Sequence, residues 1–122
     1  MEQMRNALLA VMAKHPFLSC RGFEAACVGI EAPRADLAAS VDEFERAVAW
    51  LLLVPKRQTV NRDFDSYGLK HAAERWARAY VGNGALIAAA LHLGFIIEPI
   101  DGSLNALIGV AGRSKWPKGS EI

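Results

Sequence analysis

Hydrophobic residues three and four positions apart predict helices along most of this chain. The first such stretch predicts a helix over residues 2–14, and Pro16 ends it because proline cannot continue helical hydrogen bonding. Its apolar face consists of Met4, Leu8, Val11 and Met12. A second, shorter helix is predicted over residues 19–28, where Ser19 is placed to cap the first turn and Gly29 to end the last one.

The most regular helical pattern begins at Ser40, after a connector at residues 29–39 whose later part could start the helix early. Ser40 and Glu43 have the spacing of a capping box, in which each side chain accepts a hydrogen bond from a free amide of the first turn. Apolar residues then follow at helical spacing: Val41, Phe44, Val48, Leu51 and Leu52. Pro55 ends this third helix, and the polar stretch after it predicts a basic loop over residues 55–64, with room for one short extended piece.

A fourth helix with one polar face is predicted to begin at Asp65 or Ser66, since either side chain can cap it. Its expected apolar stripe is Leu69, Ala73, Trp76 and Tyr80, and its expected outer face is Lys70, His71, Glu74, Arg75 and Arg78. Glu74 lies four residues before Arg78, a spacing that favours an ion pair.

A turn at residues 82–84, Gly-Asn-Gly, leads into a fifth helix over residues 85–93, which Gly94 ends. This helix is apolar on every side except at His92. Because a helix that is apolar all round must be buried all round, we expect it to be the centre of the molecule.

The helical pattern is lost after Gly94. Residues 95–100 and 106–110 flank an Asp-Gly-Ser turn and predict a small β-hairpin, in which Pro99 would restrict its strand to a sheet edge. A short helix over residues 103–110 fits the same sequence.

The pattern as a whole predicts a mainly α fold. We expect a single compact helical domain of about five helices over residues 1–112, with a small β-hairpin or extended element near its C-terminal end, and a basic C-terminal tail over residues 113–122. A length of 122 residues, 52% hydrophobic and 22% charged, suits one domain that buries its own core.

The net charge of +1 gives no overall attraction to nucleic acid or acidic lipid. Residues 55–78 nevertheless carry six basic and three acidic side chains, a local excess of +3. The N-terminus lacks the basic region of a signal peptide, and the uncharged residues 79–97 are broken by glycines, so they predict a core helix rather than a membrane span. We therefore expect a cytoplasmic protein with no membrane partner.

The residue types that carry chemistry are present without the spacing of a metal or catalytic motif. Cys20 and Cys27 are seven residues apart, which on one helix is too far for a disulfide. No zinc-binding spacing occurs either, so we predict no metal and no cofactor. A small enzyme that uses His71, or cysteine with histidine, is an alternative that these spacings do not favour.

Two helices joined by a glycine-containing turn also suggest a DNA-binding helix-turn-helix. Residues 85–93 offer only His92 to base edges, so DNA contacts would go to phosphates, through residues 56–78 and the tail. Trp116 stands in the basic tail without a core pattern. We therefore predict that Trp116 contacts a partner or a second subunit together with Arg113 and Lys115.

The segment SYGLKHAAERWARAYVGNGALIAAALHLGF at residues 66–95, followed by GSLNALIGV at residues 102–110, resembles small uncharacterised bacterial proteins of plasmids and integrated mobile elements. The matching positions are Tyr67, Gly68, Lys70, His71, Tyr80, Asn83 and Gly84. Leu104 stands where that pattern often has proline. The resemblance implies an accessory protein of a mobile element, of a kind that binds DNA or inhibits a host protein.

We accordingly predict a non-enzymatic accessory protein that acts through an interface with a host or element-encoded protein. A DNA-associated accessory protein is the alternative, and self-association stays open. The predicted binding residues are Tyr67, Lys70, His71, Arg75, Arg78, Asn83, Arg113, Lys115 and Trp116.

Overall fold

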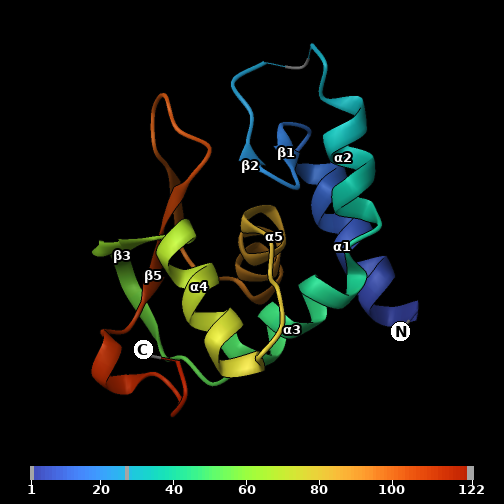
Figure 1. Ribbon diagram of the computed structural model, residues 1–122. Coiled ribbons are helices and arrows are strands. Elements are labelled where there is room, and N and C mark those ends of the chain that lie inside the picture. Colours follow the sequence, from blue (N-terminus) through green and yellow to red (C-terminus); the bar gives the residue numbers. More distant parts are fainter. Residues whose placement is uncertain (1, 27, 121–122) are drawn as a thin grey trace.

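The computed structural model describes residues 2–26 and 28–120, which form a mixed α/β fold (Figure 1). The helices are α1 (Glu2–Lys14), α2 (Glu31–Ala38), α3 (Val41–Leu51), α4 (Ser66–Ala77), α5 (Asn83–Leu93) and a 3-10 turn, η1 (Arg113–Lys115). The strands are β1 (Leu18–Ser19), β2 (Gly22–Phe23), β3 (Lys56–Asp65), β4 (Ile97–Pro99) and β5 (Ala106–Val110). The prediction of a mainly α helical bundle is therefore wrong.

Helix α5 is the centre of the molecule, as its composition predicts. Every residue from Asn83 to Ala90 is buried, and α1, α3 and α4 pack against this helix. Figure 1 shows α5 between α4 with the larger sheet on one side and α1 with α2 on the other. Gly94 ends the helix with a φ of 84°, in the left-handed region that glycine adopts without strain.

Strand β3 replaces the predicted basic loop over residues 55–64. It pairs antiparallel with β5, which also pairs with β4, giving the order β3-β5-β4. Within β3 only Asn61 is buried, and its Nδ2 donates to the Val110 carbonyl at 3.1 Å. The strand is held by its partner rather than by an apolar face of its own, so alternation of hydrophobic residues could not reveal it.

The predicted C-terminal hairpin is confirmed, and the alternative helix over residues 103–110 is wrong. Pro99 pairs with Ala106 on the edge strand β4. That is where a residue without an amide hydrogen fits a sheet.

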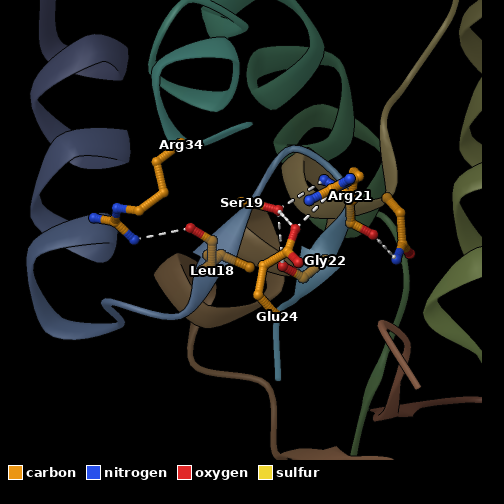
Figure 2. Close-up of polar contacts among 7 residues, drawn as sticks. Leu18, Ser19, Arg21, Gly22, Glu24 and Arg34 are labelled. Carbon is orange, nitrogen blue, oxygen red and sulfur yellow. Dashed lines mark hydrogen bonds and ion pairs between the residues drawn. The ribbon is translucent and has the colours of Figure 1, made fainter. Parts of the chain in front are cut away.

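The prediction of a second helix over residues 19–28 is wrong. Strands β1 and β2, each two residues long, form a hairpin there. Gly22 has a φ of 126°, which a helix excludes. Figure 2 shows Ser19 Oγ donating to Glu24 Oε2 at 2.6 Å, with Arg21 Nε 2.9 Å from the same oxygen. Ser19, Arg21 and Glu24 thus stabilise the turn of the hairpin, and Ser19 does not cap a helix. Cys27 lies outside the described residues, and so does the prediction for the Cys20–Cys27 pair.

The connector at residues 29–39 contains α2, and the capping box predicted for α3 is wrong. Ser40 Oγ donates back to the Asp36 carbonyl at 2.7 Å and makes no cap hydrogen bond. Glu43 Oε1 accepts instead from the Gly82 amide at 2.8 Å, which ties α3 to the start of α5.

Arg34 on α2 holds the chain that leaves α1. Its Nη1 donates to the carbonyls of His15 and Leu18 at 2.9 and 2.8 Å, and its Nη2 donates to Met12 at 2.9 Å. The bond to Leu18 is visible in Figure 2.

Replacing Arg34 with methionine should therefore lower the free energy of unfolding by about 2–4 kcal/mol, since three charge-assisted hydrogen bonds are lost together. Urea denaturation followed by circular dichroism measures this. Arg34→Lys should restore only part of the loss, because lysine lacks the planar fork. Arg5→Met, at an exposed position of α1, is the matched control, and an equal loss there would contradict the role of Arg34.

Candidate functional site

A hollow of about 630 Å³ opens where α4, the start of α5, the β1–β2 hairpin and the loop before β5 meet. We call it the polar hollow. Its lining consists of Cys20, Arg21, Asp36, Ser40, Glu43, Tyr67, Lys70, Tyr80, Gly82, Asn83, Ser103, Leu104 and Asn105. The loop is held to the hairpin because the Phe23 amide donates to the Leu104 carbonyl at 2.9 Å.

A chain of hydrogen bonds fixes Asn83 in the lining of the hollow. Asp65 Oδ1 caps α4 by accepting from the Gly68 amide at 3.0 Å, as predicted, and its Oδ2 accepts from Asn105 Nδ2 at 3.3 Å. Asn83 Nδ2 then donates to Asn105 Oδ1 at 3.0 Å and to the Arg21 carbonyl at 2.9 Å. Both amide hydrogens of Asn83 are therefore used.

The orientation of the Asn83 amide follows from these partners. A backbone carbonyl can only accept, so the group facing Arg21 must be the NH₂. Asn83 Oδ1 is then left buried, without a hydrogen-bond donor among the described residues. A buried acceptor without a donor costs about 1–3 kcal/mol, which a ligand that supplies the donor would recover.

Lys70 is buried, with 5% of its surface exposed, so its predicted place on an outer face is wrong. Its Nζ lies 3.0 Å from Glu74 Oε2, 4.4 Å from the ring centroid of Tyr80 and 5.4 Å from that of Tyr67. The two rings stay largely exposed, Tyr67 at 52% and Tyr80 at 61%. They form the aromatic rim of the polar hollow above a buried charge.

The predicted ion pair between Glu74 and Arg78 is wrong, because Glu74 pairs with Lys70 and His71 instead. His71 Nδ1 lies 2.9 Å from Glu74 Oε1, and the Val81 amide donates to Oε2 at 3.2 Å. Burial raises the pKa of the Glu74 carboxyl, but the hydrogen bonds from Val81, Lys70 and His71 outweigh it and hold the pKa below its ordinary value of 4.5. Arg78 is the left-handed C-cap of α4, with a φ of 57°.

A depressed pKa in the folded state means that ionised Glu74 stabilises the fold above pH 4.5 and that this stabilisation is lost as the pH falls through the folded-state pKa. Glu74→Gln should therefore cost about 1.5–3 kcal/mol at pH 7 and progressively less below pH 4.5. Urea denaturation at pH 7, 4.5 and about 3 measures the difference. Glu45→Gln, at an exposed position of α3, is the control, and a gap for Glu74→Gln that does not change with pH would contradict the assignment.

The remaining predicted residues lie with the C-terminal segment and do not line the hollow. Arg75 Nε donates to the Ser120 carbonyl at 2.7 Å, and the Arg113 guanidinium lies 5.4 Å from the ring centroid of Phe64. Lys115 is exposed. Trp116 is buried, so its predicted exposure is wrong.

Sequence reasoning missed most of the lining. Tyr80 was placed in a core stripe, but α4 ends at Ala77 and leaves Tyr80 exposed. Asp36, Glu43 and Asn105 come from separate elements and share no local motif. Asn105 lies in the segment that carries the resemblance, which is the one signal that pointed toward it.

Comparisons with protein-family models, curated proteins and solved structures found no match. No described helix has the length and hydrophobicity needed to cross a bilayer. Within residues 2–26 and 28–120, no three His, Cys, Asp or Glu side chains are grouped to hold a metal ion.

The Cys20 thiol in the lining does not have the lowered pKa of a nucleophilic cysteine. Burial raises the pKa of the Cys20 thiol above its ordinary value of 9.0, and the nearby charge of Asp36 raises it further. A reactive cysteine needs a lowered pKa, because the thiolate is the nucleophile. Lys70 and His71 are both paired with Glu74.

Proposed function

We propose that this protein is a non-enzymatic accessory protein of a bacterial mobile element, which acts in the cytoplasm by binding a host or element-encoded protein at the polar hollow. One observation carries the proposal: two exposed tyrosines, Tyr67 and Tyr80, border the fixed side chain of Asn83, whose Oδ1 has no hydrogen-bond donor among the described residues. Tyrosines at a rigid, concave site are typical anchors of protein interfaces. A preorganised lining also lowers the entropy cost of association.

The contacts of the basic residues favour a protein partner over DNA. Lys56 lies 5.4 Å from the Phe95 ring centroid, and Arg62 lies 3.5 Å from Glu98. Arg75 and Arg113 are engaged with Ser120 and Phe64. Each of these four side chains makes a contact within its own chain, and these contacts compete with binding to a phosphate backbone.

Site-specific photo-crosslinking tests the proposal. A benzoylphenylalanine at position 80 should crosslink a protein in the bacterial host, whereas the same group at Leu52, which is 67% exposed on the far end of α3, should not. The crosslinked protein, once purified, should bind the wild type at least about tenfold more tightly than it binds Tyr80→Ala.

Binding that weakens steeply with salt and is competed by duplex DNA would instead support the DNA-associated alternative. Equal crosslinking from positions 80 and 52 would contradict a partner site at the polar hollow.

A further inference from the structure

The charges that line the polar hollow do not balance. Its two cations are each neutralised within the chain: Arg21 Nε lies 2.9 Å from Glu24 Oε2, and Lys70 Nζ lies 3.0 Å from Glu74 Oε2. Its two anions, Asp36 and Glu43, have no ion-pair partner within 4.0 Å among the described residues. The lining therefore holds two uncompensated negative charges.

The neighbouring arginines form no ion pair with Asp36 or Glu43 among the described residues. Arg46 on α3 donates to the Tyr80 carbonyl at 2.8 Å, and Arg34 on α2 is used by the carbonyls at the end of α1. Burial is the main reason that the pKa of the Cys20 thiol is raised; the charges of Asp36, Glu24 and Glu43 raise this pKa further, and the charge of Arg21 lowers it.

Two side-chain oxygens of the lining, on Asn83 and Glu43, are acceptors that favour a positively charged donor, as the unpaired carboxylates do. Asn83, at 7% exposure, has a side-chain oxygen without a hydrogen-bond donor within residues 2–26 and 28–120, and over the same residues Glu43 accepts only through Oε1, from the Gly82 amide. Ammonium and guanidinium groups carry donors and no acceptor, so they complement such a lining without leaving a polar group unpaired.

The rim adds a third feature that favours a cation. Tyr80 already holds Lys70 Nζ at 4.4 Å from its ring centroid, and 61% of Tyr80 remains exposed. Tyrosine faces attract cations through the ring quadrupole. The exposed parts of Tyr67 and Tyr80 can therefore guide a basic side chain into the hollow.

We propose that the polar hollow recognises a lysine or arginine side chain of the partner protein, which it anchors between Asp36, Glu43 and Asn83. This inference rests on the proposed function and names the chemistry of the partner. A protein segment suits an open hollow with an aromatic rim, because residues flanking the basic side chain can pack on Tyr67 and Tyr80.

The test is a titration of the full chain with five-residue acetylated, amidated peptides, followed by amide shifts in NMR spectra. The peptides differ only at the central residue, which is arginine, lysine, citrulline or norleucine. We expect the arginine and lysine peptides to bind at least about tenfold more tightly than citrulline, which keeps the shape of arginine without its charge. The largest shifts should fall on the Asn83 side-chain amide and around Tyr80.

Variants that remove the charge of Asp36 or Glu43 show whether these two carboxylates bind the basic side chain of the peptide. Glu43→Gln keeps an acceptor for the Gly82 amide, and Asp36→Asn changes an exposed side chain, so both should fold. Each substitution should weaken binding of the arginine peptide by about three- to tenfold, a change in binding free energy of about 0.6–1.4 kcal/mol. Asp42→Asn, an exposed neighbour on α3 outside the lining, should leave the affinity unchanged.

The outcomes separate the inference from the proposed function. Citrulline or norleucine peptides that bind as well as arginine would overturn the cationic anchor and leave a partner site in place. Spermidine that binds at Asn83 while all peptides fail would overturn the protein source of the cation. If no peptide binds and position 80 gives no specific crosslink, both the inference and the proposed function are overturned.

Discussion

Replacing Trp116 with alanine should lower the free energy of unfolding by about 3–5 kcal/mol, although the sequence predicts a basic tail around it. The indole is 8% exposed and packs with ring centroids 5.5 Å from Trp50 and 4.9 Å from Phe64. Its Nε1 donates to the Ala111 carbonyl at 2.9 Å, so the variant also leaves that acceptor without its donor. Urea denaturation followed by far-ultraviolet circular dichroism measures the loss.

Two companion variants isolate the contribution of the ring. Trp116→Phe should recover much of the stability, because an aromatic ring still fills the space beside Trp50. Lys115→Ala, at the exposed neighbouring position, should change it by less than about 0.5 kcal/mol. If Trp116→Ala unfolds at the same urea concentration as Lys115→Ala, the C-terminal segment does not belong to the core.

Gly84→Ala is expected to cost about 3 kcal/mol or more, or to prevent folding, although alanine is the better helix former. A Cβ at this position would overlap the Ser19 carbonyl oxygen and would also lie 2.9 Å from the Cys20 carbonyl carbon. Both are backbone atoms, so the whole β1–β2 hairpin would have to move. The hydrogen bond from the Gly84 amide to the Cys20 carbonyl, 3.0 Å long, would be lost with it.

The matched control is Gly112→Ala, since no atom lies within 4 Å of its added Cβ and its φ is −65°. This variant should be as stable as the wild type or more stable by up to about 1 kcal/mol. Thermal melts of the two variants, run in parallel, decide the matter. A melting temperature for Gly84→Ala equal to that of Gly112→Ala would refute the close approach of α5 and the hairpin.

The sequence predicted those elements whose own side chains decide their burial. Helix α1 has the expected bounds, α5 is buried on all sides, and the β4–β5 hairpin lies where the turn residues place it. Strand β3 was not predicted because its stability comes from pairing with β5 across the sheet. The β1–β2 hairpin was not predicted because Phe23 and its neighbours also fit a helical spacing. The hairpin is held by the bonds among Ser19, Arg21 and Glu24 and by contacts with later parts of the chain, such as the bond from the Phe23 amide to the Leu104 carbonyl, which local spacing cannot show.

Three residues of the candidate site were predicted from the sequence, but the arrangement around them was not. Tyr67, Lys70 and Asn83 were predicted because they match the residue pattern that carries the resemblance. Their surroundings were not predictable, since Glu43 reaches the hollow from α3 and Asn105 from the loop before β5. Lys70 looked exposed because helical spacing cannot show that Tyr80, beyond the end of α4, folds back over it.

A chain of hydrogen bonds runs from Asp65 through Asn105 and Asn83 to Arg21. This chain determines when, during synthesis, the protein can first bind a partner. These residues come from the hairpin, the cap of α4, the start of α5 and the loop before β5, so contacts between distant parts of the sequence complete the site. During synthesis the hollow cannot be finished until Asn105 has left the ribosome. A partner that recognises the orientation of Asn83 would therefore not bind shorter nascent chains and would bind only those from which Asn105 has emerged.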